Sequence, residues 1–308
     1  MIEVITVKLQ YSDFQIVGEN YISQANDKKI KSKSFVSKIK DKPYISIIVL
    51  SIIILGCVCS SAVMNYDPTY MDLLNSNVAP NKEFYFGTDS MGRDIFSMIW
   101  YGGRASLLIG ILSTIISTFI GIVYGSISGA SSEIVDDMMM RLTEIIISIP
   151  SILIIIFVQA MLGKSTPISI SIVIGITSWM NISKIVRSEV RQIRNSEYIL
   201  AAKSMGGNFI YIVGKHLLPN FISSIMFIVV TNIGSAIAIE STLSFLGIGL
   251  PLETISWGSM LSLAEQALLT NEWWIILIPG IFLVVTLVCI TNIGNYIRKI
   301  NNKKLSNI

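Results

Sequence analysis

Six long apolar stretches alternate with polar segments along the chain. They cover residues 44–64, 105–128, 142–162, 167–185, 221–239 and 273–297. Each stretch reaches or approaches the roughly 20 residues that a helix needs to cross a hydrocarbon core of about 30 Å. The pattern therefore predicts an all-α membrane protein with six transmembrane helices.

The polar segments set the rest of the organisation. We expect a cytoplasmic tail over residues 1–43, an extracellular loop over 65–104, a five-helix core over 105–298 and a second cytoplasmic tail over 299–308. A long cytoplasmic loop, residues 181–220, lies within the core, and its size and charge suit a docking surface. The first tail is rich in lysine and weakly patterned, which is typical of a flexible segment.

The basic residues favour one orientation in the membrane. With the N-terminus inside, 19 of the 23 lysines and arginines fall in segments expected inside the cell, and 4 fall outside. Because positive charge concentrates on the cytoplasmic side of membrane proteins, both termini are predicted to be cytoplasmic. The net charge of +3 then has a topological meaning, and we expect no nucleic-acid partner.

Composition restricts the chemistry of the chain. It is 52% hydrophobic and 14% charged, which fits a multi-pass membrane protein better than a soluble domain. His216 is the single histidine, and the sequence has neither a phosphate-binding loop nor a nucleophile elbow. Cys57, Cys59 and Cys289 lie in apolar runs and are expected to be reduced thiols. We therefore expect no metal, no cofactor and no catalytic site on this chain.

A short helix is predicted inside the long cytoplasmic loop. Glu197 suits the first turn of a helix because its charge favours that end of the dipole. Asn195 or Ser196 can cap the helix, and the pair Gly206-Gly207 can end it. A helix of this length is marginal in water unless it packs against something.

The composition of this short helix suits docking into a groove. Ala201 and Ala202 present almost no side chain, so the helix backbone could lie deep in a partner protein. Tyr198, Ile199 and Met205 would then be apolar anchors. An ordinary amphipathic surface helix explains the same spacing equally well.

Several short motifs resemble a known family. Residues 200–206 read LAAKSMG and residues 216–220 read HLLPN. They resemble the Glu-Ala-Ala loop of ABC importer permeases, with Leu200 in place of the usual first Glu. The C-type permease subunits of dipeptide, oligopeptide and nickel importers are similar also to FGTDSMGRD at 86–94, DDMMMR at 136–141, IPS at 149–151, ESTLSFLGIG at 240–249 and SWG at 256–258.

The resemblance implies a non-catalytic permease of the ABC type I importer fold in the bacterial plasma membrane. Such a subunit imports peptides by alternating access, and nickel or a nickel chelate is the alternative substrate. Its implied partners are a second homologous permease, two ATPase subunits that hold ATP and Mg, an extracellular substrate-binding protein and membrane lipid. The rival from another class is an ion-gradient-driven secondary transporter that is complete in one chain.

The resemblance also assigns an ATPase-coupling helix and its base. These residues are Glu197, Tyr198, Leu200, Ala201, Ala202, Lys203, Met205, Gly206, His216 and Pro219.

An outer gate is expected near Glu240. This residue lies roughly 28 Å along a helix that starts at Phe221, close to the outer interface. The alternative is an interfacial carboxylate paired with an outer arginine. The candidate gate or pathway residues are Thr231, Asn232, Ser235, Glu240, Phe245, Gly247 and Gly249. The polar members of this set either line the pathway or bond to neighbouring helices.

The extracellular loop contains a motif with two interpretations. It is either an ion-paired internal fold, which the glycine turns favour, or a contact for the substrate-delivery protein. The residues concerned are Gly87, Thr88, Asp89, Gly92, Arg93 and Asp94.

Three other features concern helix packing. Gly121, Gly125 and Gly129 recur at every fourth residue, a spacing that lets two helices approach closely. Pro150 is expected to kink or start the third span. Trp273 and Trp274 open the sixth span, where aromatic rings suit the headgroup layer.

Overall fold

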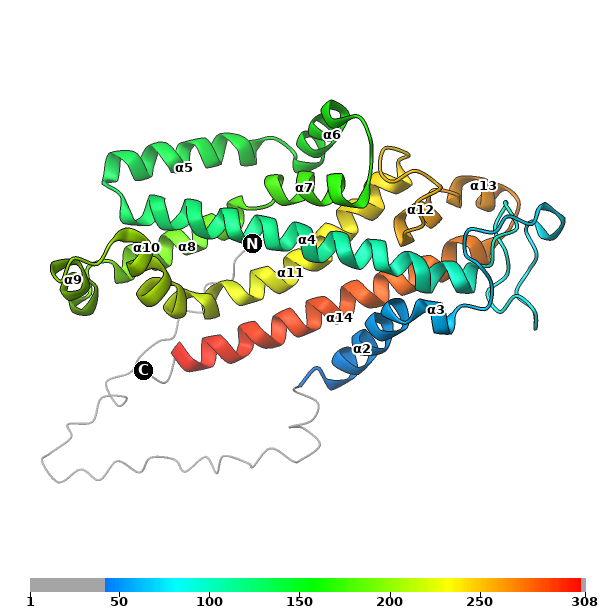
Figure 1. Ribbon diagram of the computed structural model, residues 1–308, viewed down its shortest axis with the longest axis horizontal. Coiled ribbons are helices and arrows are strands. Elements are labelled where there is room, and N and C mark those ends of the chain that lie inside the picture. Colours follow the sequence, from blue (N-terminus) through cyan, green and yellow to red (C-terminus); the bar gives the residue numbers. More distant parts are fainter. Residues whose placement is uncertain (1–41, 306–308) are drawn as a thin grey trace, which may run out of the picture. The chain divides into compact units, whose positions relative to one another are not determined.

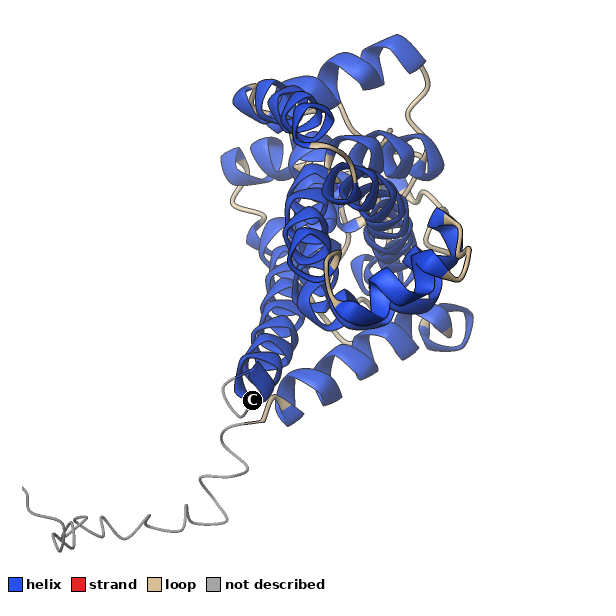
Figure 2. Cartoon of the chain, turned by 90° about the vertical axis from the view of Figure 1, so that its left-hand side faces the viewer, coloured by secondary structure: helices blue, strands red, loops and turns tan. Residues whose placement is uncertain are grey.

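The computed structural model describes residues 42–305. The expected N-terminal tail therefore falls almost entirely outside the described residues. Within residues 42–305 the chain is helical and contains no strand, only an isolated antiparallel bridge between Thr88 and Asp94 (Figure 2). The predicted all-α class is confirmed.

Three long helices form the centre of the described part. They are α4 (Ile95–Ala130), α11 (Leu218–Phe245) and α14 (Trp273–Leu305), and α11 packs against both of the others (Figure 1). Each contains a stretch that is long and apolar enough to cross a membrane. Helix α4 has 36 residues, so it is roughly 54 Å long and exceeds the thickness of a hydrocarbon core.

Helix α4 begins earlier than the apolar pattern predicts. The Asp94 carboxylate caps it, accepting from the backbone N–H of Ser97 at 2.9 Å and from the Ser97 hydroxyl at 2.6 Å. Helix α4 therefore begins within the segment that was expected to form the extracellular loop. The apolar pattern missed these turns because Gly102, Gly103 and the charged Arg104 interrupt it, although both glycines are buried.

Two of the predicted spans are bent pairs of helices. Helices α5 (Glu133–Ser148) and α6 (Ser151–Leu162) meet at an angle of 88° at Ile149-Pro150, and α7 (Pro167–Thr177) and α8 (Met180–Ile193) meet at 43°. Proline cannot donate the helical hydrogen bond, which accounts for a break at Pro150. By length and composition, the described residues hold three spanning helices, or up to five if each bent pair is one span.

The first predicted span is shorter than expected. Helix α2 (Tyr44–Val58) has 15 residues, and the four-residue helix α3 (Ser60–Val63) follows it. Arg104 of α4 holds the junction, donating from Nε to the carbonyl of Cys57 at 2.8 Å and from Nη2 to the carbonyl of Val58 at 2.9 Å. These bonds satisfy carbonyls that the end of α2 leaves without a helical partner.

Short helices connect the long ones. They are η2 (Leu73–Asn75), α9 (Glu197–Ser204), α10 (Phe209–Ile212), the π-helical turn η3 (Val213–Leu217), α12 (Trp257–Leu261) and α13 (Ala264–Leu269).

The glycine stripe of α4 lies against α8. A Cβ atom at Gly125 would lie 2.5 Å from the carbonyl oxygen of Ser183, and one at Gly129 would lie 2.8 Å from that of Arg187. Atoms cannot approach so closely, so glycine is required for this helix contact. The expected close approach is present, and it lies within this chain.

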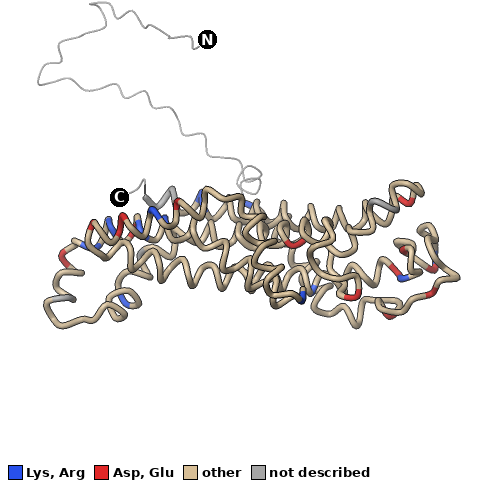
Figure 3. Tube along the Cα trace, turned by 90° about the horizontal axis from the view of Figure 1, so that it is seen from above, with Lys and Arg blue, Asp and Glu red and all other residues tan. Residues whose placement is uncertain are grey.

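Charged residues and exposed apolar residues occupy different parts of the long helices. Charged residues gather toward the two ends of these helices, and the middle is mostly uncharged (Figure 3). Large apolar side chains of α4 such as Ile115 and Phe119 are exposed. This distribution suits helices whose outer faces contact lipid tails.

Candidate functional site

The predicted short helix is present as α9, Glu197–Ser204. Gly206 follows it with φ of +84°, a left-handed conformation that glycine adopts without strain. The N–H of Gly207 donates to the carbonyl of Ala202 at 3.0 Å, which closes the last turn. The Ser196 hydroxyl donates to the carbonyl of Ile193 at 2.7 Å and so ties the start of α9 to α8.

One face of α9 packs onto its own chain. Ile199 is 1% exposed and Ala202 is 3% exposed. Ile199 belongs to a buried cluster with residues of α8 and α11, including Val186 and Phe221. The expectation that Ile199 would anchor a partner protein is therefore wrong, because its side chain is covered from within.

The opposite face of α9 continues into an exposed apolar surface, which we call the α9–α10 patch. Met205 and Ile210 are 82% and 80% exposed. The patch comprises Tyr198, Leu200, Met205, Phe209, Ile210 and Tyr211. An exposed cluster of this kind is typical of a protein interaction site.

The base of the α9–α10 patch connects to α11. The His216 ring lies 5.6 Å from the ring of Tyr211 and 6.3 Å from that of Tyr198. Leu217 is buried, and Pro219 lies in the first turn of α11. The base of the patch is therefore packed onto α8 and α11 through Leu217.

A charged cluster joins α4, α5 and α8 near the same end. Asp136 is 1% exposed and accepts two hydrogen bonds from Arg187, at 2.6 and 2.7 Å, and one from Arg191 at 2.9 Å. The Ser128 hydroxyl donates to it at 2.5 Å. Paired, hydrogen-bonded geometry of this kind is what a buried carboxylate requires.

Glu240 lies at the other end of α11 and is fully buried. Its Oε1 accepts hydrogen bonds from Ser256 at 2.8 Å and Ser244 at 3.0 Å. Its Oε2 accepts longer bonds, both 3.4 Å, from Ser106 and Ser241. The alternative of a carboxylate paired with an outer arginine is therefore wrong, since hydroxyl groups supply the contacts.

Helix α12 is held against this carboxylate. The backbone N–H of Trp257 donates to the Ser106 hydroxyl at 3.1 Å, and its indole Nε1 donates to the carbonyl of Ile99 at 3.0 Å. A Cβ atom at Gly258 would lie 2.8 Å from Glu240 Oε1. Glu240 thus sits where α4, α11 and α12 meet.

Two of the other expected pathway residues, Thr231 and Ser235, form hydrogen bonds within their own helix. The hydroxyl of Thr231 donates to carbonyls of Phe227 and Ile228, and that of Ser235 donates to Thr231, all within α11. Asn232 is half-buried, and its Nδ2 finds no hydrogen-bond partner among the described residues.

The loop after α11 changes direction at two glycines, and the aromatic ring that precedes it is exposed. Gly247 has φ of +75°, and Phe245 is 53% exposed. A Cβ atom at Gly249 would overlap Ser244. The backbone N–H of Leu250 donates to the Ser244 hydroxyl at 3.0 Å, which fixes this loop beside Glu240.

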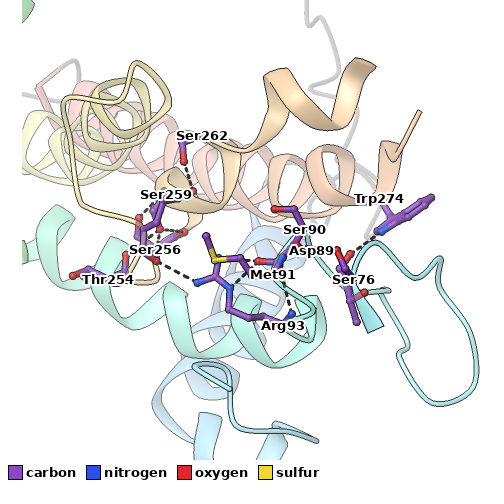
Figure 4. A network of polar contacts seen from close by, with 12 residues as sticks. Ser76, Asp89, Ser90, Met91, Arg93, Thr254, Ser256, Ser259, Ser262 and Trp274 are labelled. Carbon is purple, nitrogen blue, oxygen red and sulfur yellow. Dashed lines mark hydrogen bonds and ion pairs between the residues drawn. The ribbon is translucent and has the colours of Figure 1, made fainter. Parts of the chain in front are cut away.

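The loop motif forms an ion-paired fold. Arg93 contacts Asp89 at 2.7 Å, both side chains are almost fully buried, and Arg93 Nη1 also donates to the carbonyl of Leu252 at 3.2 Å (Figure 4). Gly87 and Gly92 have positive φ of +77° and +72°. The motif therefore braces the loop against the segment before α12.

Trp274 is not the free membrane anchor that its position suggested. It is 8% exposed, and its indole Nε1 donates to the carbonyl of Thr88 at 3.1 Å (Figure 4). The loop thus covers the start of α14.

The sequence matches a family model described as "Binding-protein-dependent transport system inner membrane component" over residues 121–307, more than half of the chain. The chain belongs to this family. Among its relatives, the oligopeptide transport system permease protein OppC of Bacillus subtilis (strain 168) is 35% identical over 261 residues, covering 85% of each chain.

Other relatives of the permease are also peptide transport proteins. The dipeptide transport system permease protein DppC of the same organism is 34% identical, covering 76% of this chain and 72% of its own length. A putative peptide permease protein of Brucella suis is 32% identical, covering 76% and 77%. The apolar helices and the family together identify a multi-pass membrane permease with a transport role.

The sequence did not reveal the hydrogen-bond donors of the two buried carboxylates, Asp136 and Glu240. The motif at residues 136–141 included Asp136, but Arg187 and Arg191 were given no role, although arginines four residues apart on one helix were a usable signal. The serines around Glu240 were also given no role. Ser106 and Ser256 are far from Glu240 in sequence, whereas Ser241 and Ser244 follow it on α11.

Proposed function

We propose that the permease imports peptides across the bacterial plasma membrane, driven by two partner ATPases that bind ATP and Mg. A second homologous permease would complete the pathway, and an extracellular binding protein would deliver the substrate. The proposed peptide substrate is inferred from relatives that are oligopeptide and dipeptide transport system permeases. The observation that carries the coupling step is α9, which is packed on one face and exposed and apolar on the other.

The proposed mechanism is alternating access through α9. An ATPase docked on the α9–α10 patch must favour one state of the helical bundle over the other, since equal affinity would shift nothing. Ile199 and Ala202 would pass the displacement into α8 and α11. A helix ended by a glycine turn and packed on the core suits this role better than a loose loop.

The proposed topology has six spans and cytoplasmic termini. Each bent pair would count as one span, and α2 with its neighbour α3 would be the shortest. The concentration of basic residues on the expected inner segments supports this orientation. The chain itself would hold no metal or nucleotide and carry out no catalysis.

Cross-linking in active membranes tests this function. Met205→Cys places a thiol at a highly exposed position of the α9–α10 patch, and Lys164→Cys places a control thiol in the exposed loop between α6 and α7. We expect Met205→Cys, but not the control, to cross-link to a partner ATPase. Uptake of a labelled peptide in proteoliposomes should require ATP and both ATPases. Uptake by the purified chain without them would establish a secondary transporter instead.

A further inference from the structure

A stripe of charge runs along an exposed side of α5. Asp137, Arg141 and Glu144 are spaced four and three residues apart, so they lie on the same side of the helix. Lys184 of α8 lies across from them. These four residues, with Met140, Arg187 and Ser188, line an open cavity of about 530 Å³, which we call the α5–α8 cavity.

The charged residues of this cavity form few close ion pairs, although Asp137 and Glu144 lie near enough to Arg187 to interact with it electrostatically. Asp136 already holds Arg187 through two short hydrogen bonds. In residues 42–305, no ion pair within 4 Å joins Asp137, Arg141, Glu144 or Lys184 to another residue. Asp137, Arg141 and Glu144 are exposed and Lys184 is half-buried, so these four side chains are accessible to water or to a polar ligand.

The balance of charge points to a dipolar ligand. Two carboxylates, Asp137 and Glu144, and three cations, Arg141, Lys184 and Arg187, line the cavity, and Asp136 already binds Arg187. A purely anionic group would meet repulsion from Asp137 and Glu144. A small zwitterion satisfies both signs, with its ammonium group near a carboxylate and its carboxylate near Arg141 or Lys184. The volume lies within the range of roughly 300–1,000 Å³ that is usual for small-molecule sites.

We propose that the α5–α8 cavity is a water-filled binding site for a short peptide with free termini, on the cytoplasmic side of the pathway. The proposal rests on the proposed function, which supplies the substrate class and the orientation. It adds a residue set: Glu144 and Asp137 bind the ammonium end, and Arg141 and Lys184 bind the carboxylate end.

Thiol protection tests the site. Ser188 is exposed and lines the cavity without charge, so Ser188→Cys serves as a conservative reporter. The complete transporter, in inside-out vesicles without ATP, is treated with a membrane-impermeant maleimide. Labelling of the parent chain, which lacks the reporter, measures the background from Cys57, Cys59 and Cys289. We expect modification of the reporter to slow about tenfold when Ala-Ala is present at ten times its Kd.

Four comparisons decide the result. N-acetyl-Ala-Ala-amide, which has no terminal charges, should not protect, and nor should inorganic phosphate. In the reporter background, Glu144→Gln or Lys184→Gln should weaken binding of Ala-Ala about tenfold, as expected for loss of one charge-assisted contact, so that the same concentration slows modification only about twofold. The matched control Glu133→Gln, on the same helix but outside the cavity, should leave protection unchanged.

Several outcomes would overturn the proposal. A reporter that never reacts would mean that water does not enter the cavity. Equal protection by the capped peptide or by phosphate would replace the zwitterion with another ligand. ATP-dependent uptake is measured in the same preparation. Normal uptake without protection overturns this site only, whereas loss of uptake in the parent transporter counts against the proposed function.

Discussion

Neutralising Asp136 should destabilise the permease more than neutralising its exposed neighbour. Asp136 is 1% exposed and accepts two hydrogen bonds from Arg187, one from Arg191 and one from Ser128. Asp136→Asn removes the charge and turns an N–H₂ group toward the guanidinium groups. The three elements α4, α5 and α8 would then lose their shared ionic contact.

The magnitude follows from how exposed the arginines are. Breaking a fully buried ion pair costs about 3–5 kcal/mol, because a charge stays behind without a partner. Arg187 and Arg191 are 24% and 38% exposed, so water partly solvates the charges left behind. We therefore expect a loss of about 3 kcal/mol, at the lower end of that range. At about 2–4 °C for each kcal/mol, the Tm should fall by roughly 6–12 °C.

The assay is thermal unfolding of the purified permease in detergent, read as the temperature at which half of the monodisperse protein is lost. Asp137→Asn is the matched control, since the neighbouring carboxylate is exposed, and it should shift stability by less than about 0.5 kcal/mol. Adding Arg187→Gln to Asp136→Asn should cost less than the sum of the two single changes. Equal Tm values for Asp136→Asn and Asp137→Asn would refute the reasoning.

Three further predictions concern two glycines and the buried carboxylate of Glu240. Gly125→Leu should prevent α4 from packing on α8 and lower stability by about 1–3 kcal/mol, whereas Gly280→Leu, where no atom lies within 4 Å of an added Cβ, should be tolerated in the same thermal assay. Gly206→Val should strain the left-handed turn by about 1–3 kcal/mol and abolish ATP-dependent uptake while membrane insertion stays normal; full uptake would contradict the role of α9. Glu240→Gln should alter substrate-stimulated ATP hydrolysis more than ATPase binding, and an unchanged stimulation ratio would reduce Glu240 to a structural residue.

The sequence by itself determined the helical class and the local elements. Apolar stretches of sufficient length predicted the long helices, and Glu197 with Gly206 bounded α9 correctly, because capping and left-handed turns depend on residues close in sequence. The glycine spacing on α4 likewise predicted a close helix contact. Sequence motifs also indicated the permease family, which the comparisons confirm.

Tertiary structure decided which faces of these elements are free. Ile199 and Met205 both read as apolar anchors, yet one is buried by α8 and α11 and the other is exposed. Trp274 is buried under the loop and donates a hydrogen bond to it, and Glu240 accepts hydrogen bonds from serines and, among the described residues, does not pair with an arginine. Hydrophobic periodicity reports how apolar a position is, but burial and hydrogen bonding depend on which distant segment packs against it, and local sequence does not encode that partner.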